Sequence, residues 1–310
     1  MVCSIIIATF NRARVLEKTL RHLAEGSVPS SWDVELIIAD NGSTDDTSAV
    51  VGGSKLKNVE VRYLYEGRKG KPHALNASLA QARGEIILLT DDDVAPAKDW
   101  LERMGRPLLE RECDGAVGRI ELAQEVRRPW MTPLHLSWLG DFHGKPMHMP
   151  GANMGFHRSV LDRVPAFDPE LFSSLYGAAE DTLFYFQLSE AGFRLKYIPE
   201  ALVVHYPDAS RLVRSRWLSI ARKRGASRAY IRHHWRHEER PLPRLRYCYV
   251  ALKLRLRLLL EPPPPMDAEG IAPWEMSYVE EMEACRQSLV ERQRPRNYSK
   301  RGLIKHGQPT

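Results

Sequence analysis

The sequence predicts an α/β fold with a mainly parallel, Rossmann-like sheet that is covered by helices on both faces. Two observations carry this prediction. Short apolar runs alternate four times with segments of helical spacing in the N-terminal half, and a polar cluster follows each apolar run. Ligands of such sheets gather at the carboxyl ends of the strands. A third observation, the arginine-rich C-terminal third, indicates a basic helical extension after the sheet.

The composition is that of a globular chain. Of 310 residues, 43% are hydrophobic and 27% are charged, which excludes wholesale disorder. A chain of this length can form one large domain or one domain with an appendage, and we expect a domain with a tail. No window reaches the roughly 18 uninterrupted apolar residues that a transmembrane helix needs, so the chain is not expected to cross a bilayer.

Charge and cysteine usage narrow the partners and the compartment. The net charge is +6, and arginines gather in residues 211–257 and 286–305. This asymmetry favours an anionic partner such as a phosphate group, a lipid headgroup or nucleic acid. The four cysteines are far apart in the sequence, which argues against a disulfide framework or a zinc site and favours the reducing cytoplasm.

Four strands are predicted at residues 2–8, 35–40, 59–65 and 85–90, because each is a short apolar run. Helices are predicted at residues 14–24 and in the segment after Pro72, where apolar residues recur at helical spacing. The polar clusters "TFNR", "DNGSTDD", "EGRKGK" and "DDD" follow the four strands in turn. All four therefore fall at the edge where a parallel sheet binds its ligands.

The rest of the chain is predicted to close the sheet and then to form helices. Residues 123–150 are expected to form a long ordered loop over the site. A short strand follows in "PGANMGF", a helix runs from "GAAEDT" to about Gly192, and "LKYIPEALVVHYP" indicates two short strands. A basic helix is expected over about 209–235. The segment "LKLRLRLLL" fits a half-buried strand or a helix with a leucine stripe; we favour the helix, ended by four prolines.

The three consecutive carboxylates Asp91, Asp92 and Asp93 end the fourth strand. In extended backbone, Asp91 and Asp93 share one side and Asp92 faces away. Two like charges about 4 Å apart cost on the order of 4 kcal/mol at an effective dielectric constant of about 20, and a divalent cation would remove that cost. Oxygen ligands favour Mn²⁺ or Mg²⁺. The alternative is a turn with solvated acids, which the other three polar clusters disfavour.

Two further clusters suit a nucleotide. Asp40, at the end of its strand, can accept hydrogen bonds from a base or a ribose. After it, Ser43 or Thr44 is expected to cap a helix that has Asp45 and Asp46 in its first turn. In "EGRKGKPHALN", the residues Arg68, Lys69 and Lys71 precede a helix N-terminus, an arrangement that suits a diphosphate.

Together these segments resemble glycosyltransferase family 2, whose members have the GT-A fold and use nucleotide sugars. "CSIIIATFNR" is similar to the family's first strand, and "ELIIADNGSTDDT" resembles its nucleobase-contacting segment. "GKPHALNASLAQARGEIILLTDDDV" resembles the helix and strand that carry the D-x-D motif, and "GAAEDTLFYFQLSEAGFRL" resembles the E-D segment and its helix. The match runs from Cys3 to about His205, and the order of four motifs makes it specific.

The resemblance implies a role for each of these residues. Asp91 and Asp93 would be the D-x-D pair, with Asp93 the direct metal ligand, although Asp92 could take one of these roles. Asp181 would be the general base, with Glu180 holding the acceptor or the base. His205 would bind the metal or the diphosphate, and Asn153 would lie on the acceptor side. The metal ligands would then be Asp93, Asp91 and His205, and the donor would contact Thr9, Asn11, Arg12, Asp40, Gly70, Lys71, Asn76, Asp91 and Asp92.

These residues predict a metal-dependent, inverting glycosyltransferase. A cation and basic side chains neutralise the charge on the leaving nucleoside diphosphate, and an ionised carboxylate takes the proton of the acceptor hydroxyl. A UDP-sugar donor and a glycan or lipid-linked acceptor are expected. Residues 1–122 would bind the nucleotide sugar and residues 123–240 the acceptor, with a mixed acceptor-side sheet, and residues 241–310 would form the basic extension.

Two other functions compete with this prediction. A nucleic-acid-binding protein could use the basic segment around Trp217, Tyr230 and Trp235, but acids at the centre of the site would repel a polyanion. A metal-dependent phosphohydrolase shares the acidic strand end, but it would consume its substrate without an acceptor. For the basic extension, a helix in an anionic membrane interface and a helix docked on the sheet remain open. The predicted location is the cytoplasm, including the inner face of the membrane.

Overall fold

The computed structural model describes residues 2–143, 148–172, 175–177 and 179–299. The chain forms two compact units. The first unit comprises Met1–Arg127, Leu136–Pro169 and Glu180–Tyr206, and the second comprises Arg128–His135, Glu170–Ala179 and Pro207–Thr310. The boundaries of these units differ from those of the predicted domains 1–240 and 241–310, because the basic helix after residue 213 packs with the C-terminal helices. The division into donor and acceptor parts remains a prediction.

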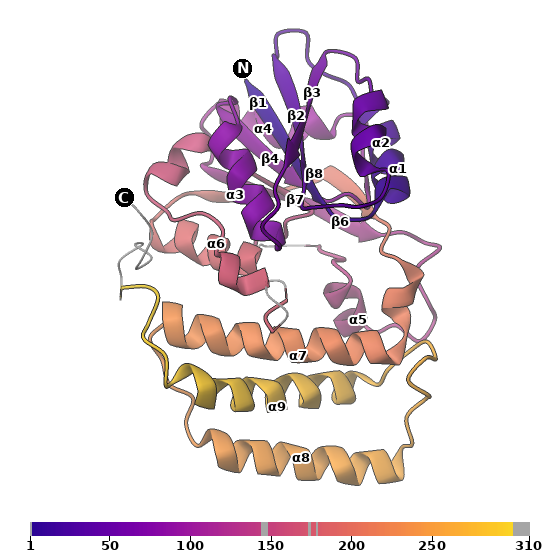
Figure 1. Cartoon of the computed structure of the whole chain (residues 1–310), viewed down its shortest axis with the longest axis vertical. Helices are drawn as coiled ribbons and strands as arrows, with labels where there is room; N and C mark the ends of the chain where they lie inside the picture. Colours follow the sequence, from indigo (N-terminus) through magenta and orange to yellow (C-terminus); the bar gives the residue numbers. More distant parts are fainter. Residues whose placement is uncertain (1, 144–147, 173–174, 178, 300–310) are drawn as a thin grey trace. The chain divides into compact units, whose positions relative to one another are not determined.

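The first unit is built on an eight-stranded sheet with the order β3-β2-β1-β4-β7-β6-β8-β5 (Figure 1). The first four strands in this order pair in parallel, as the sequence predicts. The strands β7, β6, β8 and β5 extend the sheet with antiparallel and parallel pairs, which is the expected mixed part. Their bounds are β1 Cys3–Thr9, β2 Val34–Asp40, β3 Val59–Tyr65, β4 Ile86–Thr90, β5 Val94–Pro96, β6 Gly115–Leu122, β7 Asn153–His157 and β8 Leu195–His205.

Helices cover both faces of the sheet. The apolar residues of α1 (Ala13–Ala24), α2 (Thr47–Gly53) and α4 (Trp100–Leu109) join one core cluster with alternate residues of β1, β2 and β4. The helix α3 (Lys71–Gln81) lies on the other side of the sheet (Figure 1) and buries Leu75 and Leu79. Apolar residues on alternate sides of each strand therefore meet a helix, which is why β1, β2 and β4 are apolar almost throughout.

Several predicted elements differ in detail from the structure. The helix after Asp40 begins at Thr47, so Asp45 and Asp46 precede it instead of forming its first turn. The two predicted closing strands are one strand, β8, whose register shifts opposite Gly118 and Arg119 of β6. The predicted loop at 123–150 contains α5 (Pro133–Trp138), and its residues 144–147 lie outside the described residues. The helix α6 (Glu180–Glu190) ends before Gly192, as predicted.

The second unit is helical. It contains α7 (Arg214–Tyr230) with a π-helical turn at Ile231–Trp235, α8 (Pro243–Leu260) and α9 (Pro273–Glu291). The helix α9 lies between α7 and α8 (Figure 1) and packs against both. Gly225 allows the close approach, because a Cβ there would lie 2.2 Å from the carbonyl oxygen of Glu280. The predicted basic helix and the helix in "LKLRLRLLL" are confirmed.

A buried polar cluster ties the end of α9 to the rest of this unit. The Glu291 carboxylate, fully buried, accepts hydrogen bonds from Tyr176 and Gln287 and faces Nε2 of His234 at 2.9 Å. Arg294 joins the same carboxylate at 3.2 Å. Burial opposes ionisation of Glu291, but these partners lower its pKa to about 2. None of the helices in the described part of the chain combines the length and the apolarity that crossing a membrane requires.

A second buried carboxylate, Glu35, ties β2 to its neighbouring strands β1 and β3 and to the segment that follows α3. Its oxygens accept hydrogen bonds from Ser4 Oγ at 2.6 Å, Arg62 Nη1 at 2.5 Å and Arg83 Nε at 3.0 Å. Burial alone would raise the pKa of Glu35, but these hydrogen bonds lower it to about 2. Because this value lies below the ordinary 4.5, the carboxylate stabilises the fold above pH 4.5, and this contribution is lost as the pH falls towards 2.

We predict that Glu35→Gln lowers the free energy of unfolding most at pH 7, and that its difference from wild type narrows on acidification. At 1.36 kcal/mol per pKa unit, the full narrowing is on the order of 3 kcal/mol. Urea denaturation at pH 7, 4.5 and 3 measures the part of this narrowing that is reached by pH 3, about 2 kcal/mol. Glu17→Gln, in an exposed pair with Arg21, is the control and should change stability by less than about 0.5 kcal/mol. A pH-independent difference for Glu35→Gln would contradict the assignment.

Candidate functional site

The three aspartates follow the end of β4, and the second and third lie in a turn. The strand ends at Thr90, and Asp92 and Asp93 form the turn that leads into β5. Thr19 of α1 fixes this backbone, because its hydroxyl lies within hydrogen-bond distance of the carbonyl oxygens of Asp92 and Val94, at 2.8 and 2.9 Å, and shares its one proton between them. The side chains of Asp92 and Asp93 both contact Arg12. The prediction that Asp92 faces away from Asp93 is therefore wrong, since strict alternation holds only in extended backbone.

Arg12 binds two of the carboxylates at once. Its Nη1 lies 2.5 Å from Asp92 Oδ1, and its Nη2 lies 2.8 Å from Asp93 Oδ2. Thr9, at the end of β1, donates to Asp92 Oδ2 at 2.7 Å. Burial raises the pKa of Asp92 to about 6 against the attraction of Arg12. Burial also opposes ionisation of Asp93, but His205 and Arg12 hold its pKa well below the usual range.

Lys71 provides a second positive charge beside the acidic turn. Its ammonium group pairs with Asp91, and the position that a Cβ of Gly151 would take lies 3.4 Å from Nζ. Burial lowers the pKa of Lys71, but the charges of Asp91 and of the α6 acids Glu180 and Asp181 raise it overall. Lys71 therefore lies among Asp91, which follows β4, and the acids at the start of α6.

His205 faces Asp93 from the end of β8. Its Nε2 lies 3.3 Å from Asp93 Oδ1, and its Nδ1 lies 2.7 Å from the carbonyl oxygen of Leu139. A carbonyl oxygen only accepts, so Nδ1 carries a proton. In the neutral ring, Nε2 then presents a lone pair to a carboxylate oxygen. This contact is favourable only with a second proton on the ring or with a cation held between the two atoms.

The loops after β1 and β2 form a second polar region. Asp40 accepts hydrogen bonds from the Ser43 amide at 2.8 Å and from the Tyr63 hydroxyl at 2.6 Å. Asn11 has a left-handed backbone, with φ of 52°, and its side chain accepts from the Thr44 amide at 2.7 Å. The carboxylate predicted to bind a base or ribose is therefore held by the neighbouring strand and by its own loop.

Asn41 links this region to the start of α3. Its amide donates to the carbonyl oxygen of Arg68 at 2.7 Å, and its side-chain oxygen accepts from the Gly70 amide at 2.7 Å. Gly70 has a φ of 126°, a conformation that favours glycine. Arg68 pairs with Glu66 at 2.7 Å. Of the three cations predicted before α3, Lys71 is the one for which a contact with the acidic turn is described.

The predicted general base lies at the first turn of α6. Asp181 accepts hydrogen bonds from the Gly151 amide at 3.2 Å and from the Thr182 amide at 2.6 Å. Glu180 beside it is buried. Both acids act on Lys71, so the structure brings Asp181 and Glu180 into the same neighbourhood as Asp91.

Two predicted site residues have structural roles. Asn153 is fully buried: its oxygen accepts from Trp100 Nε1, and its amide donates to the carbonyl oxygens of Arg119 and Ala201, each at 2.8 Å. Asn76 exchanges hydrogen bonds with the backbone of Phe167 at 2.7 and 3.2 Å. Asn153 is thus engaged on all sides within the sheet, and the expectation that its side chain faces an acceptor is corrected.

The sequence reasoning missed Asn41 and Tyr63. Asn41 directly follows the strand-end Asp40, so the adjacency of two polar residues at a strand end was a usable signal. Tyr63 reaches Asp40 from β3, whose register pairs Tyr63 with Ile38. Nothing short of the strand pairing places that hydroxyl near Asp40.

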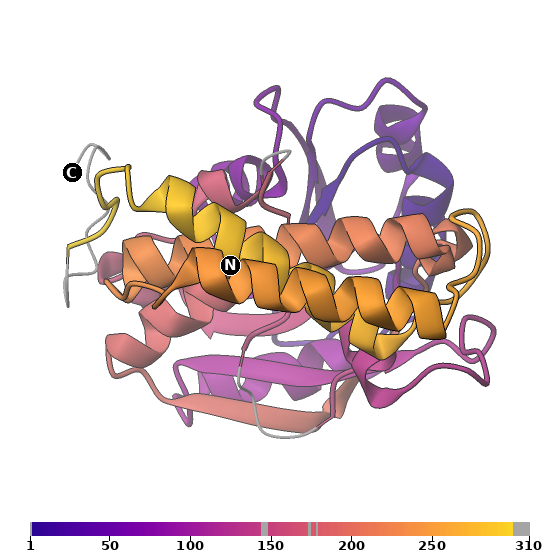
Figure 2. The ribbon, with the colours of Figure 1, turned by 90° about the horizontal axis from the view of Figure 1, so that it is seen from below.

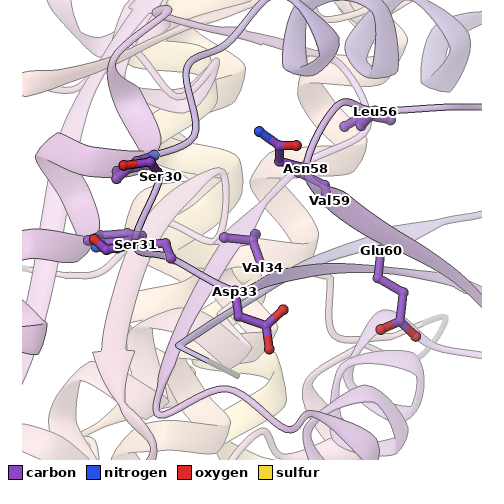
Figure 3. Close-up of a pocket in the computed structure, with 10 residues that line it drawn as sticks. Ser30, Ser31, Asp33, Val34, Leu56, Asn58, Val59 and Glu60 are labelled. Atoms are coloured by element: carbon purple, nitrogen blue, oxygen red, sulfur yellow. The ribbon is translucent and has the colours of Figure 1, made fainter.

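A hollow of about 670 Å³ lies at the opposite edge of the sheet (Figure 3). It is lined by residues before β2 and β3, including Ser30, Ser31, Asp33 and Asn58. These residues are at the amino ends of the strands, whereas the acidic turn follows a carboxyl end.

Within the described ranges, no group of three or more His, Cys, Asp or Glu side chains could hold a metal ion.

Comparison with known proteins identifies the family. The sequence model described as Glycosyl transferase family 2 matches residues 4–164, which is just over half of the 310 residues. The chain belongs to this family. The match covers almost all of β1 and the strands from β2 to β7, and it includes the acidic turn.

Individual relatives are distant. This family 2 chain is 22% identical over 213 residues to the probable glycosyltransferase YdaM of Bacillus subtilis, covering 64% of this chain and 49% of that protein. It spans half or less of the length of several curated relatives that it matches.

Two solved structures share the fold. A mannosyltransferase from Pyrobaculum calidifontis, solved with GDP-Man and Mn²⁺, superposes with a TM-score of 0.58 at 19% identity, covering 93% of this chain and 86% of that chain. S. aureus TarS 1-349 in complex with UDP gives a TM-score of 0.52 at 19% identity, covering 94% and 92%. The predicted GT-A fold is therefore confirmed.

We predict that Asn153→Ala destabilises the fold, because it leaves the Trp100 N–H and two carbonyl oxygens buried without their partner. The expected loss in the free energy of unfolding is on the order of 3 kcal/mol, measured by urea denaturation. Gln124→Ala, at an exposed position, is the control and should lose less than about 0.5 kcal/mol. Unchanged stability of Asn153→Ala would show that its side chain is not needed inside the sheet.

Proposed function

We propose that this chain transfers a sugar from a nucleoside diphosphate donor to an acceptor hydroxyl, with inversion at the anomeric carbon. The observation that carries the proposal is the contact of His205 Nε2 with Asp93 Oδ1 at 3.3 Å, beside an Arg12 that bridges Asp92 and Asp93. The family membership of the chain supports the same reaction.

The donor atoms at this contact fit a divalent cation. Two ligands at right angles on an ion with bonds of about 2.1 Å lie about 3 Å apart, close to the distance between His205 Nε2 and Asp93 Oδ1. The Nδ1 proton of His205 is directed to a backbone carbonyl, as in most metal-ligating histidines. Mg²⁺ is commonly held by one or two carboxylates together with substrate phosphates. We therefore propose Asp93 and His205 as ligands of Mn²⁺ or Mg²⁺, whereas Asp91, which was predicted as a third ligand, pairs with Lys71.

The leaving group is stabilised from two sides. When bound, the cation would neutralise charge on the diphosphate oxygens as the bond to the sugar breaks. Lys71, at the start of α3, has its ammonium group beside the acidic turn and can move from Asp91 to the diphosphate. Arg12 keeps Asp92 and Asp93 in place while the donor binds. In this account Thr9, Asn11, Asp40, Gly70 and Asp92 complete the donor site.

Asp181 supplies the base. Its two amide hydrogen bonds orient the carboxylate, and an ionised carboxylate can take the proton of the attacking hydroxyl. The proposed mechanism uses one base and no covalent nucleophile of the enzyme. The acceptor hydroxyl then displaces the nucleoside diphosphate in a single step, which inverts the anomeric carbon. Glu180 supports the acceptor or the base.

For the donor and the acceptor, we propose a UDP-sugar and a glycan or lipid-linked hydroxyl. The TarS structure contains UDP, and the Pyrobaculum structure contains GDP-Man with Mn²⁺, so titration with both nucleotides is required. We also propose that the protein acts in the cytoplasm and contacts the inner face of an anionic membrane peripherally.

We predict that UDP binds only with Mn²⁺ or Mg²⁺ present, and that Asp93→Asn weakens this binding by at least about tenfold, because a cation ligand is lost. Isothermal titration calorimetry measures the dissociation constant with and without the metal. Asp99→Asn, in an exposed pair with Arg103 on α4, is the matched control and should bind as wild type does. If UDP and GDP both fail to bind wild type, the proposed function is wrong.

We predict that Asp181→Asn keeps metal-dependent UDP binding within about threefold of wild type but lowers kcat by at least about a hundredfold, because general base catalysis contributes this much. Donor and acceptor screening followed by steady-state kinetics measures it. A variant that transfers sugar at the wild-type rate would remove Asp181 from the role of base. Release of free sugar by wild type without any acceptor would favour a hydrolase.

A further inference from the structure

The outward face of α8 carries a continuous apolar stripe. Leu245, Leu252 and Leu256 are 66%, 57% and 52% exposed. Tyr249 and Leu259 on the same helix are 56% and 79% exposed. These five positions recur at alternating steps of four and three residues, so they lie on one side of the helix. The helix is 18 residues long, so the stripe runs for most of about 27 Å.

Basic residues flank the stripe on both sides. The helix contains five lysine and arginine residues and no acidic residue. On the helical wheel, Arg244 and Arg255 fall on one side of the stripe and Lys253 on the other. No carboxylate is described within ion-pair distance of Arg244 or Arg255. The exposed face therefore combines an apolar centre with a rim of positive charge.

The opposite face of α8 accounts for its packing. Val250 and Pro243 are buried on that side, and Arg246 pairs with Glu281 of α9. Figure 2 shows α8 in front of α9 when this unit is viewed from below. The helix is therefore fixed by α9, and the leucine stripe is not used in holding the unit together.

We propose that the stripe of α8 inserts into the interface of an anionic lipid bilayer, with the helix lying parallel to the surface. An amphipathic helix with leucines on one face and arginines or lysines along its edges has the chemistry of interfacial binding. Basic residues close to the surface add attraction to anionic headgroups. This inference rests on the peripheral membrane contact included in the proposed function and names the surface that makes it, but it does not depend on the transfer reaction.

A second copy of this chain is the competing occupant, because steps of four and three residues also suit a helix pair. In such a pair, the positive rims would lie against each other without acids between them, and like charges across a helix interface disfavour association. Charge complementarity therefore favours the anionic bilayer.

The test is flotation of the full chain with vesicles of phosphatidylcholine containing about 30% phosphatidylserine. We expect wild type to bind these vesicles at least about tenfold more tightly than vesicles of phosphatidylcholine alone. The double variant Leu252→Asn/Leu256→Asn should lose at least about tenfold in binding. The control Val290→Asn changes another exposed apolar residue, on α9, and should bind as wild type does.

A charge variant tests the contribution of the basic rim separately from that of the leucine stripe. Arg244→Gln/Arg255→Gln should weaken binding to the anionic vesicles by several-fold and reduce its sensitivity to salt. Circular dichroism and thermal unfolding check that each variant is folded, which is expected because the changed side chains are exposed. Metal-dependent UDP titration should be unchanged in all of them, so a failure of vesicle binding is distinguishable from a failure of the transfer proposal.

Two outcomes would overturn the inference. The first is wild-type protein that stays unbound in the presence of anionic vesicles. The second is a dimer, detected by light scattering, that Leu252→Asn/Leu256→Asn dissociates while vesicle binding is the same for wild type and variant.

Discussion

Carboxylates in the buried turn after β4 stay ionised only where positive charge meets them. Asp92 and Asp93 are each 4% exposed, and their mutual repulsion adds to the cost of burial. Arg12 offsets the cost of burial and repulsion with two ion pairs from one guanidinium group, whose planar fork suits paired oxygens. Thr9 ends β1 and Arg12 directly precedes α1. Their contacts therefore bind the turn after β4 to the neighbouring strand β1 and to the start of α1.

The rest of the site is arranged around this constraint. Lys71 meets Asp91 from α3, His205 meets Asp93 from β8, and Asp181 approaches Lys71 from α6. Each residue comes from the end of a strand or the start of a helix, which a parallel sheet brings to one edge. A donor with its cation would enter a site in which positive and negative side chains are already paired. Exchange of these partners on binding is how such a site can hold a diphosphate with its cation.

The sequence predicts what depends on periodicity and on adjacency. The first four strands were found because buried parallel strands are apolar throughout, and Asp91, Asp93 and Lys71 were found because they follow strands or precede a helix. The alternation that separated Asp92 from Asp93 failed because the chain leaves the strand at Thr90. Tyr63 was missed because its contact with Asp40 depends on strand register.

The helix α9 was missed for a different reason. Its buried residues include Glu275, Gln287 and Glu291, so its core face is not apolar and the hydrophobic period is weak. These polar groups have partners within the second unit, such as Arg214 for Glu275 at 2.5 Å. Asn153 was assigned to the acceptor by resemblance, whereas its three hydrogen bonds lie inside the sheet. Neither the helix α9 nor the role of Asn153 could be predicted locally, because both depend on contacts with residues far away in the sequence.

The central claim is that Asp93 and His205 bind one divalent cation together with the nucleotide. Pulsed electron paramagnetic resonance of Mn²⁺ with UDP tests it most directly, because a nitrogen ligand gives a characteristic modulation from the imidazole. The account predicts this modulation in wild type and in the control His22→Gln, a change on α1, and its loss in His205→Gln. Bound Mn²⁺ with no nitrogen modulation in wild type, or with a modulation that survives in His205→Gln, would contradict the account.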